Sequence, residues 1–191
     1  MQTDQILLYD QPVYDTVHIP ITAAGAVNAT LFTVPYGSTI TGAVVKTIAQ
    51  TNMIQAGRLE QGHRLEITGV SWHIPIHAGA GAAPTFADMK ALRTCSFRLW
   101  IADKPFLEVP LCLIPGGGAD GVYQSNIAAA ATEWSYLNGN SVHQNRYVLA
   151  HPLSLEAGVS FKAAIADNVT AVAAPIWATV VLWGTHYRPA N

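Results

Sequence analysis

The stretch that decides the fold reads Ser96-Phe97-Arg98-Leu99-Trp100-Ile101-Ala102-Asp103-Lys104-Pro105-Phe106-Leu107-Glu108-Val109-Pro110-Leu111. Apolar and polar side chains alternate on both sides of the turn at 103–105, and the apolar ones occupy odd positions. This alternation predicts a β-hairpin with one face in the core. With both odd sets facing inward, we expect Ile101 to pair with Leu107 and Trp100 to pair with Glu108.

The two cysteines of the chain flank this hairpin. By the same alternation, Cys95 faces inward and Cys112 faces outward. Because their side chains leave opposite faces of the sheet, we predict two free thiols and no disulfide.

A second strand signal covers residues 64–77 and changes phase in the middle. Leu65 and Ile67 occupy odd positions, whereas the apolar residues from Val70 onward occupy even positions. A slip of one residue at Gly69 is typical of a β-bulge, so we expect one long, bent strand.

The remaining segments extend the β pattern. Residues 175–187 are apolar at successive positions, which predicts a central strand covered on both faces. Further strands are expected at 6–10, 30–34, 39–48, 144–150 and 158–166. Two loop helices are expected: one at 85–92, where Thr85 and Asp88 resemble a capping box, and one at 125–137, from an apolar stripe that includes Trp134.

These elements define the expected fold class and domain organisation. Strands without regular helices between them predict an all-β sandwich or barrel. No linker or charge run divides the 191 residues, so we expect one domain over residues 1–191. An all-β chain of this length suffices for one jelly roll and not for two.

Charge is scarce in this chain. Half of the residues are hydrophobic and only 12% are charged, where soluble domains typically have about 25%. Uncharged stretches cover 16–45, 67–87 and 168–187. Part of the surface is therefore expected to contact other protein. The alternative is a β-domain whose surface is polar without being charged.

The distribution of charge also bears on partners and location. Ten Lys and Arg residues are scattered singly, so no basic arm can neutralise phosphates, and direct nucleic-acid binding is not expected. The amino-terminal residues 1–5 carry no basic region of a secretory signal, so we expect the chain to stay inside the cell that makes it. No stretch predicts a membrane-spanning helix, because 168–187 contains Pro175, Gly184 and His186.

No catalytic or metal site emerges from the motifs. Gly116-Gly117-Gly118 lacks the Lys-Ser or Lys-Thr of a phosphate loop, which favours a plain loop. His63, His73 and His77 form the one histidine cluster, but positions four apart on a strand are about 13 Å apart. Neither a nucleophile motif nor a convergent pair of carboxylates is present. We therefore expect no enzyme activity, no cofactor and no metal.

Among the five tryptophans, Trp100 is the candidate for a surface role, since it falls on the outer face of the hairpin. Trp72, Trp177 and Trp183 are expected in the core.

Three stretches resemble a known family. They are 65–72 (Leu-Glu-Ile-Thr-Gly-Val-Ser-Trp), 104–118 (Lys-Pro-Phe-Leu-Glu-Val-Pro-Leu through Ile114-Pro115 and the three glycines), and the end from Leu182 through Gly184 to Tyr187-Arg188-Pro189. In these the chain is similar to the single jelly-roll capsid proteins of tailless, internal-membrane double-stranded DNA bacteriophages. The likeness covers about residues 60–189.

The resemblance implies an eight-stranded jelly roll that stands upright in an icosahedral shell above a lipid membrane. The implied partners are copies of the chain and a second capsid protein, and the implied location is the virion, assembled in the host cytoplasm. Contacts between subunits are expected at Phe32 and Tyr36, at Gly116, Gly117 and Gly118, and at Trp100 and Glu108. The alternative is a receptor-binding or lectin-like virion spike that holds a glycan with Trp100 and the loops at 78–84 and 115–121.

Overall fold

Two antiparallel sheets form the body of the protein in its computed structural model. The structure describes residues 6–9, 11–40, 45–74, 86–115, 121–126, 132–137 and 145–189. The first sheet contains β1 (Ile6–Tyr9), β2 (Val13–Ile19), β4 (Arg64–His73), β9 (Tyr147–Glu156) and β11 (Ile176–Pro189). The second sheet contains β3 (Asn28–Leu31), β5 (Ser96–Ile101), β6 (Lys104–Pro110) and β10 (Phe161–Ala166).

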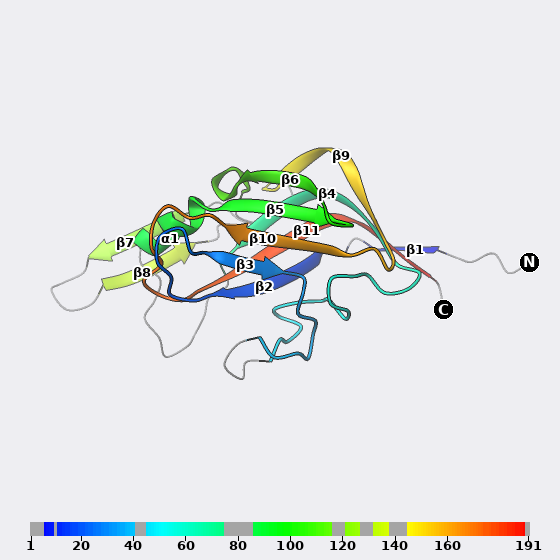
Figure 1. Ribbon diagram of the computed structural model, residues 1–191, viewed down its shortest axis with the longest axis horizontal. Coiled ribbons are helices and arrows are strands. Elements are labelled where there is room, and N and C mark those ends of the chain that lie inside the picture. Colours follow the sequence, from blue (N-terminus) through cyan, green and yellow to red (C-terminus); the bar gives the residue numbers. More distant parts are fainter. Residues whose placement is uncertain are drawn as a thin grey trace, which may run out of the picture.

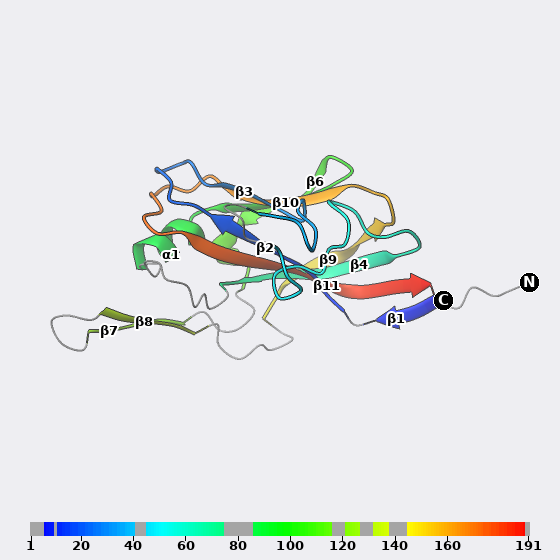
Figure 2. The same ribbon diagram turned by 90° about the horizontal axis from the view of Figure 1, so that it is seen from below.

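The order of the strands is that of a jelly roll. The first sheet runs β2-β11-β4-β9, with β1 paired to the far end of β11, and the second runs β3-β10-β5-β6. Along the chain the path therefore crosses repeatedly from one sheet to the other, as two interleaved Greek keys require. Figure 2 shows the two layers, with β3 and β10 above β11 and β4. The predicted all-β sandwich is confirmed.

The core lies between the sheets and is supplied by alternate residues of their strands. Phe97, Leu99 and Ile101 of β5 face inward and are buried, as the alternation predicts. In β11 every residue from Ala178 to Leu182 is buried, which confirms a central strand covered on both faces. Trp72 is fully buried and donates its indole N–H to the carbonyl of Ile114 at 2.8 Å.

The hairpin β5–β6 has the predicted faces but a different register. Leu99 pairs with Leu107 and Arg98 with Glu108, so the expected pairing of Trp100 with Glu108 is wrong by two residues. The turn consists of Ala102 and Asp103, whose φ values of 49° and 61° are those of a two-residue type I′ turn. An irregularity between Leu99 and Trp100 then restores the pairing of the apolar faces.

The bulge in β4 is confirmed. Gly69 pairs with Trp183 and Ile67 pairs with Gly184, so Thr68 is the additional residue. Glycine is required on both sides of this kink because the backbones approach closely. A Cβ atom on Gly69 would lie 2.9 Å from the carbonyl oxygen of Tyr147, and one on Gly184 would collide with the carbonyl of Glu66.

One predicted helix is present and the other is wrong. The helix α1 (Phe86–Arg93) matches the first. Its Asp88 is buried and accepts hydrogen bonds from the backbone N–H groups of Ala173 and Ala174, at 2.5 and 3.3 Å, so it fixes the β10–β11 connection. The helix expected at 125–137 is replaced by a hairpin of β7 (Gly121–Asn126) and β8 (Thr132–Leu137), at the same end of the molecule as α1 (Figure 1).

Several strand boundaries differ from the sequence expectations. β3 ends at Leu31 instead of 34, β9 begins at Tyr147, and β2 was not anticipated. The described residues of 39–48 contain only an isolated bridge between Thr39 and Val45 instead of a strand. A short 3-10 helix, η1 (Leu111–Leu113), follows β6.

Candidate functional site

The long β3–β4 connection, residues 32–63, covers the free edge of β2. Asn52 accepts a hydrogen bond from the backbone N–H of Tyr14 at 3.0 Å, and the Thr51 hydroxyl donates to the Tyr14 carbonyl at 3.2 Å. Asp15 and Thr51 also form an isolated bridge. Because an open strand edge is a template for wrong pairing, this connection closes the first sheet on that side.

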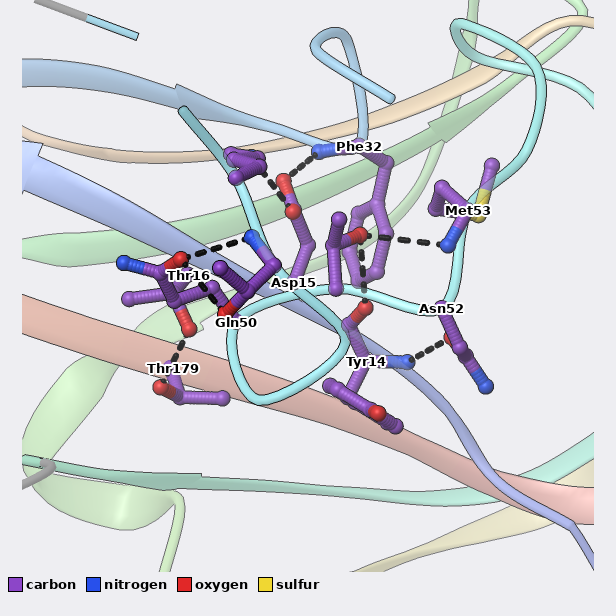
Figure 3. Close-up of polar contacts among 11 residues, drawn as sticks. Tyr14, Asp15, Thr16, Phe32, Gln50, Asn52, Met53 and Thr179 are labelled. Carbon is purple, nitrogen blue, oxygen red and sulfur yellow. Dashed lines mark hydrogen bonds and ion pairs between the residues drawn. The ribbon is translucent and has the colours of Figure 1, made fainter. Parts of the chain in front are cut away.

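A buried ion pair holds the connection in place. Lys46 Nζ lies 2.5 Å from Asp15 Oδ1, and the two side chains are only 3% and 0% exposed. The second carboxylate oxygen of Asp15 accepts the backbone N–H of Phe32 at 2.6 Å, as Figure 3 shows. Burial raises the pKa of Asp15 above its usual value, while Lys46 and the hydrogen bonds act in the opposite direction.

Several exposed apolar side chains belong to this connection. Four of the ten large hydrophobic side chains that are exposed in the described part of the chain belong to it, so it differs from the rest of the surface. We call these residues the loop patch: Tyr36, Val45, Ile48 and Ile54, each 48–63% exposed. Between residues 33 and 54 the only charged side chain is Lys46, which is buried. The described residues of 33–54 are thus anchored from within and offer an uncharged, partly apolar exterior.

The predicted contact residues Tyr36 and Phe32 lie in this region but differ in exposure. Tyr36 belongs to the loop patch, and its backbone N–H donates to Met53 at 2.7 Å. Phe32 is fully buried and contacts Phe161 at 5.3 Å between ring centroids, so its side chain is a core residue and is not available to a neighbour.

Trp100 lines a hollow that also borders the β3–β4 connection. Its volume is about 250 Å³, and its walls come from the β3–β4 connection, the β5–β6 turn and the start of β10. Lys162 Nζ lies 5.7 Å from the centre of the Trp100 ring, within the range of a cation–π contact. Asp103, Arg58 and Ser160 complete the polar lining.

Glu108 does not lie beside Trp100. It forms an ion pair with Arg98, with Arg98 Nε 3.0 Å from Glu108 Oε1, and Arg98 also lies 2.6 Å from Asp167. These partly exposed side chains form a charged network on the outer face of the second sheet. Gly116, Gly117 and Gly118 lie outside the described residues, as does the predicted glycan loop at 78–84.

The histidines show a contact that sequence reasoning missed. His63 lies 5.2 Å from His186 between ring centroids, although the two are far apart in the chain. Both ring nitrogens of His186 are buried without a hydrogen-bond partner. Burial, aided by Arg188 and His63, lowers the pKa of His186 to about 4.

No metal centre is visible in the part of the chain that the structure describes, where no three potential ligands gather. His77 lies outside that part, so the histidine cluster of the sequence is described only at His63 and His73.

The cysteines lie as predicted. Cys95 is buried and Cys112 is exposed, and both are free thiols. Burial, with a smaller contribution from the charge of Asp167, raises the pKa of Cys95 to about 12.

Among the described residues, no helix has the length and apolar character that crossing a bilayer requires. Comparison of the chain with models of protein families, with curated proteins and with solved structures gives no match.

Proposed function

We propose that this chain is a non-enzymatic shell subunit of a virus particle, which assembles with copies of itself and with a second capsid protein. The observation that carries the proposal is the loop patch. A segment such as residues 33–54, with several exposed apolar side chains and no exposed charge, is unusual on a monomer, and here a buried ion pair anchors it.

The chemistry of the patch favours another low-charge protein as its partner. A charged partner would have to desolvate its charges against a surface that offers no counter-charge. A copy of the same chain, with 12% charged residues, has no such cost over much of its surface. Because residues 51 and 52 occupy the edge of β2, neighbours dock through side chains and not by adding a strand.

The proposed place of the subunit in a virus shell is based on the resemblance of the sequence to single jelly-roll capsid proteins. A jelly roll needs partners to cover uncharged sides, and closed symmetric shells supply them. The absence of a basic arm in the sequence supports a shell that does not hold its genome directly. We place the subunit in the virion, after assembly in the host cytoplasm, with a lipid membrane beneath the shell.

The test is sedimentation of the purified protein over a range of concentrations and salt. We expect self-association that changes little with ionic strength, because apolar contacts drive it. Ile48→Ser with Ile54→Ser should weaken it by at least about tenfold, since burial of one such side chain contributes about 1.5–3 kcal/mol. Val169→Ser, at an exposed apolar position outside the patch, is the matched control.

A compact monomer at the highest concentration would contradict self-assembly through the patch. So would an equal loss of association in the double variant and in the Val169 control.

A further inference from the structure

The hollow at Trp100 is built from three connections that are distant in sequence. Thr33 and Arg58 come from the β3–β4 connection, Asp103 from the β5–β6 turn, and Ser160 and Lys162 from the entry to β10. Their backbones are joined by hydrogen bonds. Gly57 donates to Phe32 at 2.7 Å and accepts from Phe161 at 2.8 Å, and Ala102 donates to Ser160 at 2.8 Å. The site is therefore formed before any ligand arrives, which reduces the entropic cost of binding.

The lining of this hollow carries two cations and one carboxylate. Arg58 and Lys162 both line it and are both exposed, and neither forms an ion pair with any residue that the structure describes. The other charged lining residue is Asp103, so the lining carries one excess positive charge. This contrasts with Arg98 nearby, whose guanidinium is paired with two carboxylates. Two cations against one carboxylate favour a ligand that carries a negative group.

The rest of the lining suits a ring with hydroxyl groups. The half-buried indole of Trp100 offers an apolar surface, against which the C–H face of a sugar can pack once Lys162 turns from the ring to the negative group of the ligand. Thr33 and Ser160 offer hydroxyls, and Asp103 offers a carboxylate that accepts hydrogen bonds from ligand hydroxyls. A volume of about 250 Å³ is below the usual range of about 300–1,000 Å³ for ligand pockets, which limits the occupant to one ring.

We propose that this hollow binds a single acidic saccharide unit. The ligand carboxylate lies between Arg58 and Lys162, the sugar ring packs on Trp100, and the ring hydroxyls contact Asp103 and Ser160. The proposal is independent of shell assembly, since none of these residues belongs to the loop patch.

The test is a nuclear magnetic resonance titration of the intact protein with D-glucuronate and with D-glucose. The two sugars differ in the carboxylate, so the comparison isolates the contribution of the cations. We expect saturable shifts with glucuronate, including the indole N–H of Trp100, which is assigned with Trp100→Phe. Glucose should bind at least about tenfold more weakly, as expected for the loss of a charge-assisted contact.

Variants locate the site. Arg58→Gln and Lys162→Gln should each weaken glucuronate binding about tenfold. Both positions are exposed, so the fold should tolerate them. Lys90→Gln removes an exposed cation from α1, away from this hollow, and should leave glucuronate binding unchanged.

Four results would overturn the proposal. Equal affinity for glucose and glucuronate would remove the role of the cations. Acetate or inorganic phosphate binding as tightly as glucuronate would reduce the site to a simple anion site. An absence of saturable shifts at millimolar glucuronate, or equal weakening by Lys90→Gln, would remove the site altogether.

Discussion

Asp15 is the residue on which the order of the β3–β4 connection depends. Its carboxylate joins β2 to Lys46 and to the backbone of Phe32, in a position without access to water. Taking both charges out of water is costly, so the pair as a whole need not add stability. We expect its role to be specificity, since the arrangement of the connection seen here satisfies both charges.

This role predicts an asymmetry between single and double replacement. Lys46→Met leaves a buried carboxylate uncompensated and should lower the free energy of unfolding by about 3–5 kcal/mol. Combining Lys46→Met with Asp15→Asn removes the buried negative charge and keeps an acceptor for the N–H of Phe32. The free energy of unfolding should therefore fall less in the double variant than in Lys46→Met. Urea denaturation measures both. A loss near 1 kcal/mol or less for Lys46→Met would show that the pair behaves as an exposed one.

His186 predicts a pH dependence of stability. Its pKa is lowered to about 4 in the folded protein, whereas an unfolded histidine has a pKa near 6.5. As the pH falls, the unfolded chain takes up the proton first. The contribution of His186 is therefore fully present above about pH 6.5 and is lost as the pH falls towards about 4.

Denaturation of His186→Phe between pH 7 and 4.5 should show a smaller loss of stability than denaturation of the unchanged protein. His151→Gln alters an exposed histidine and is the control, which should keep the original slope. An identical slope in the His186 variant would mean that this imidazole does not govern the acid range.

Among the elements, the bulge of β4 depends on the absence of a side chain at Gly184. The adjacent β4 backbone occupies the space where a Cβ atom would lie. Gly184→Ala should therefore lower the free energy of unfolding by about 3 kcal/mol, the upper range for overpacking. Thr185→Ala changes the next, half-buried residue and should cost much less. Thermal unfolding measures the stability of both variants. An equal loss of stability in Gly184→Ala and Thr185→Ala would contradict the close approach of the β4 and β11 backbones.

The hairpin β5–β6 predicts different reactivities for its flanking thiols. Cys112 is exposed, whereas the thiol of Cys95 is buried and its pKa is raised to about 12. A thiolate-specific reagent should modify one thiol in the native protein and both in denaturant. Rapid modification of both thiols without denaturant would contradict the inward position of Cys95.

The same hairpin shows how far sequence reasoning reaches. Alternation fixes which face of a strand is buried, and it was right for Phe97 and Leu99. It does not fix register, which depends on the two-residue turn at Ala102 and Asp103 and on the irregularity between Leu99 and Trp100. Together these move the pairing by two residues. β2 was missed because its inward position 15 carries a charge, which breaks the apolar pattern.

The helix expected at 125–137 was wrong for a different reason. Ser125 to Leu137 contains alanines and spaced apolar residues that match a helical stripe equally well. What distinguishes a strand from a helix here is the pairing of β7 with β8, and the periodicity of a single segment contains no information about pairing.

On the scale of the whole molecule, the candidate surfaces are products of the jelly-roll topology. The connections after β3, β5 and β9 meet at one end because β10 lies between β3 and β5 and runs antiparallel to both. Trp100 could be selected from the sequence by its outward position. Arg58 and Lys162 could not, since nothing local relates them to Trp100.

The central position of β11 has a consequence for how the protein is made. Its partners β1, β2 and β4 all precede it in the chain by a long interval. At about 5–20 residues per second, a ribosome finishes β4 on the order of ten seconds before β11. During that time the early strands lack the neighbour that joins them. This interval, more than the finished sandwich, is when a chain with so little charge is most exposed to wrong pairing.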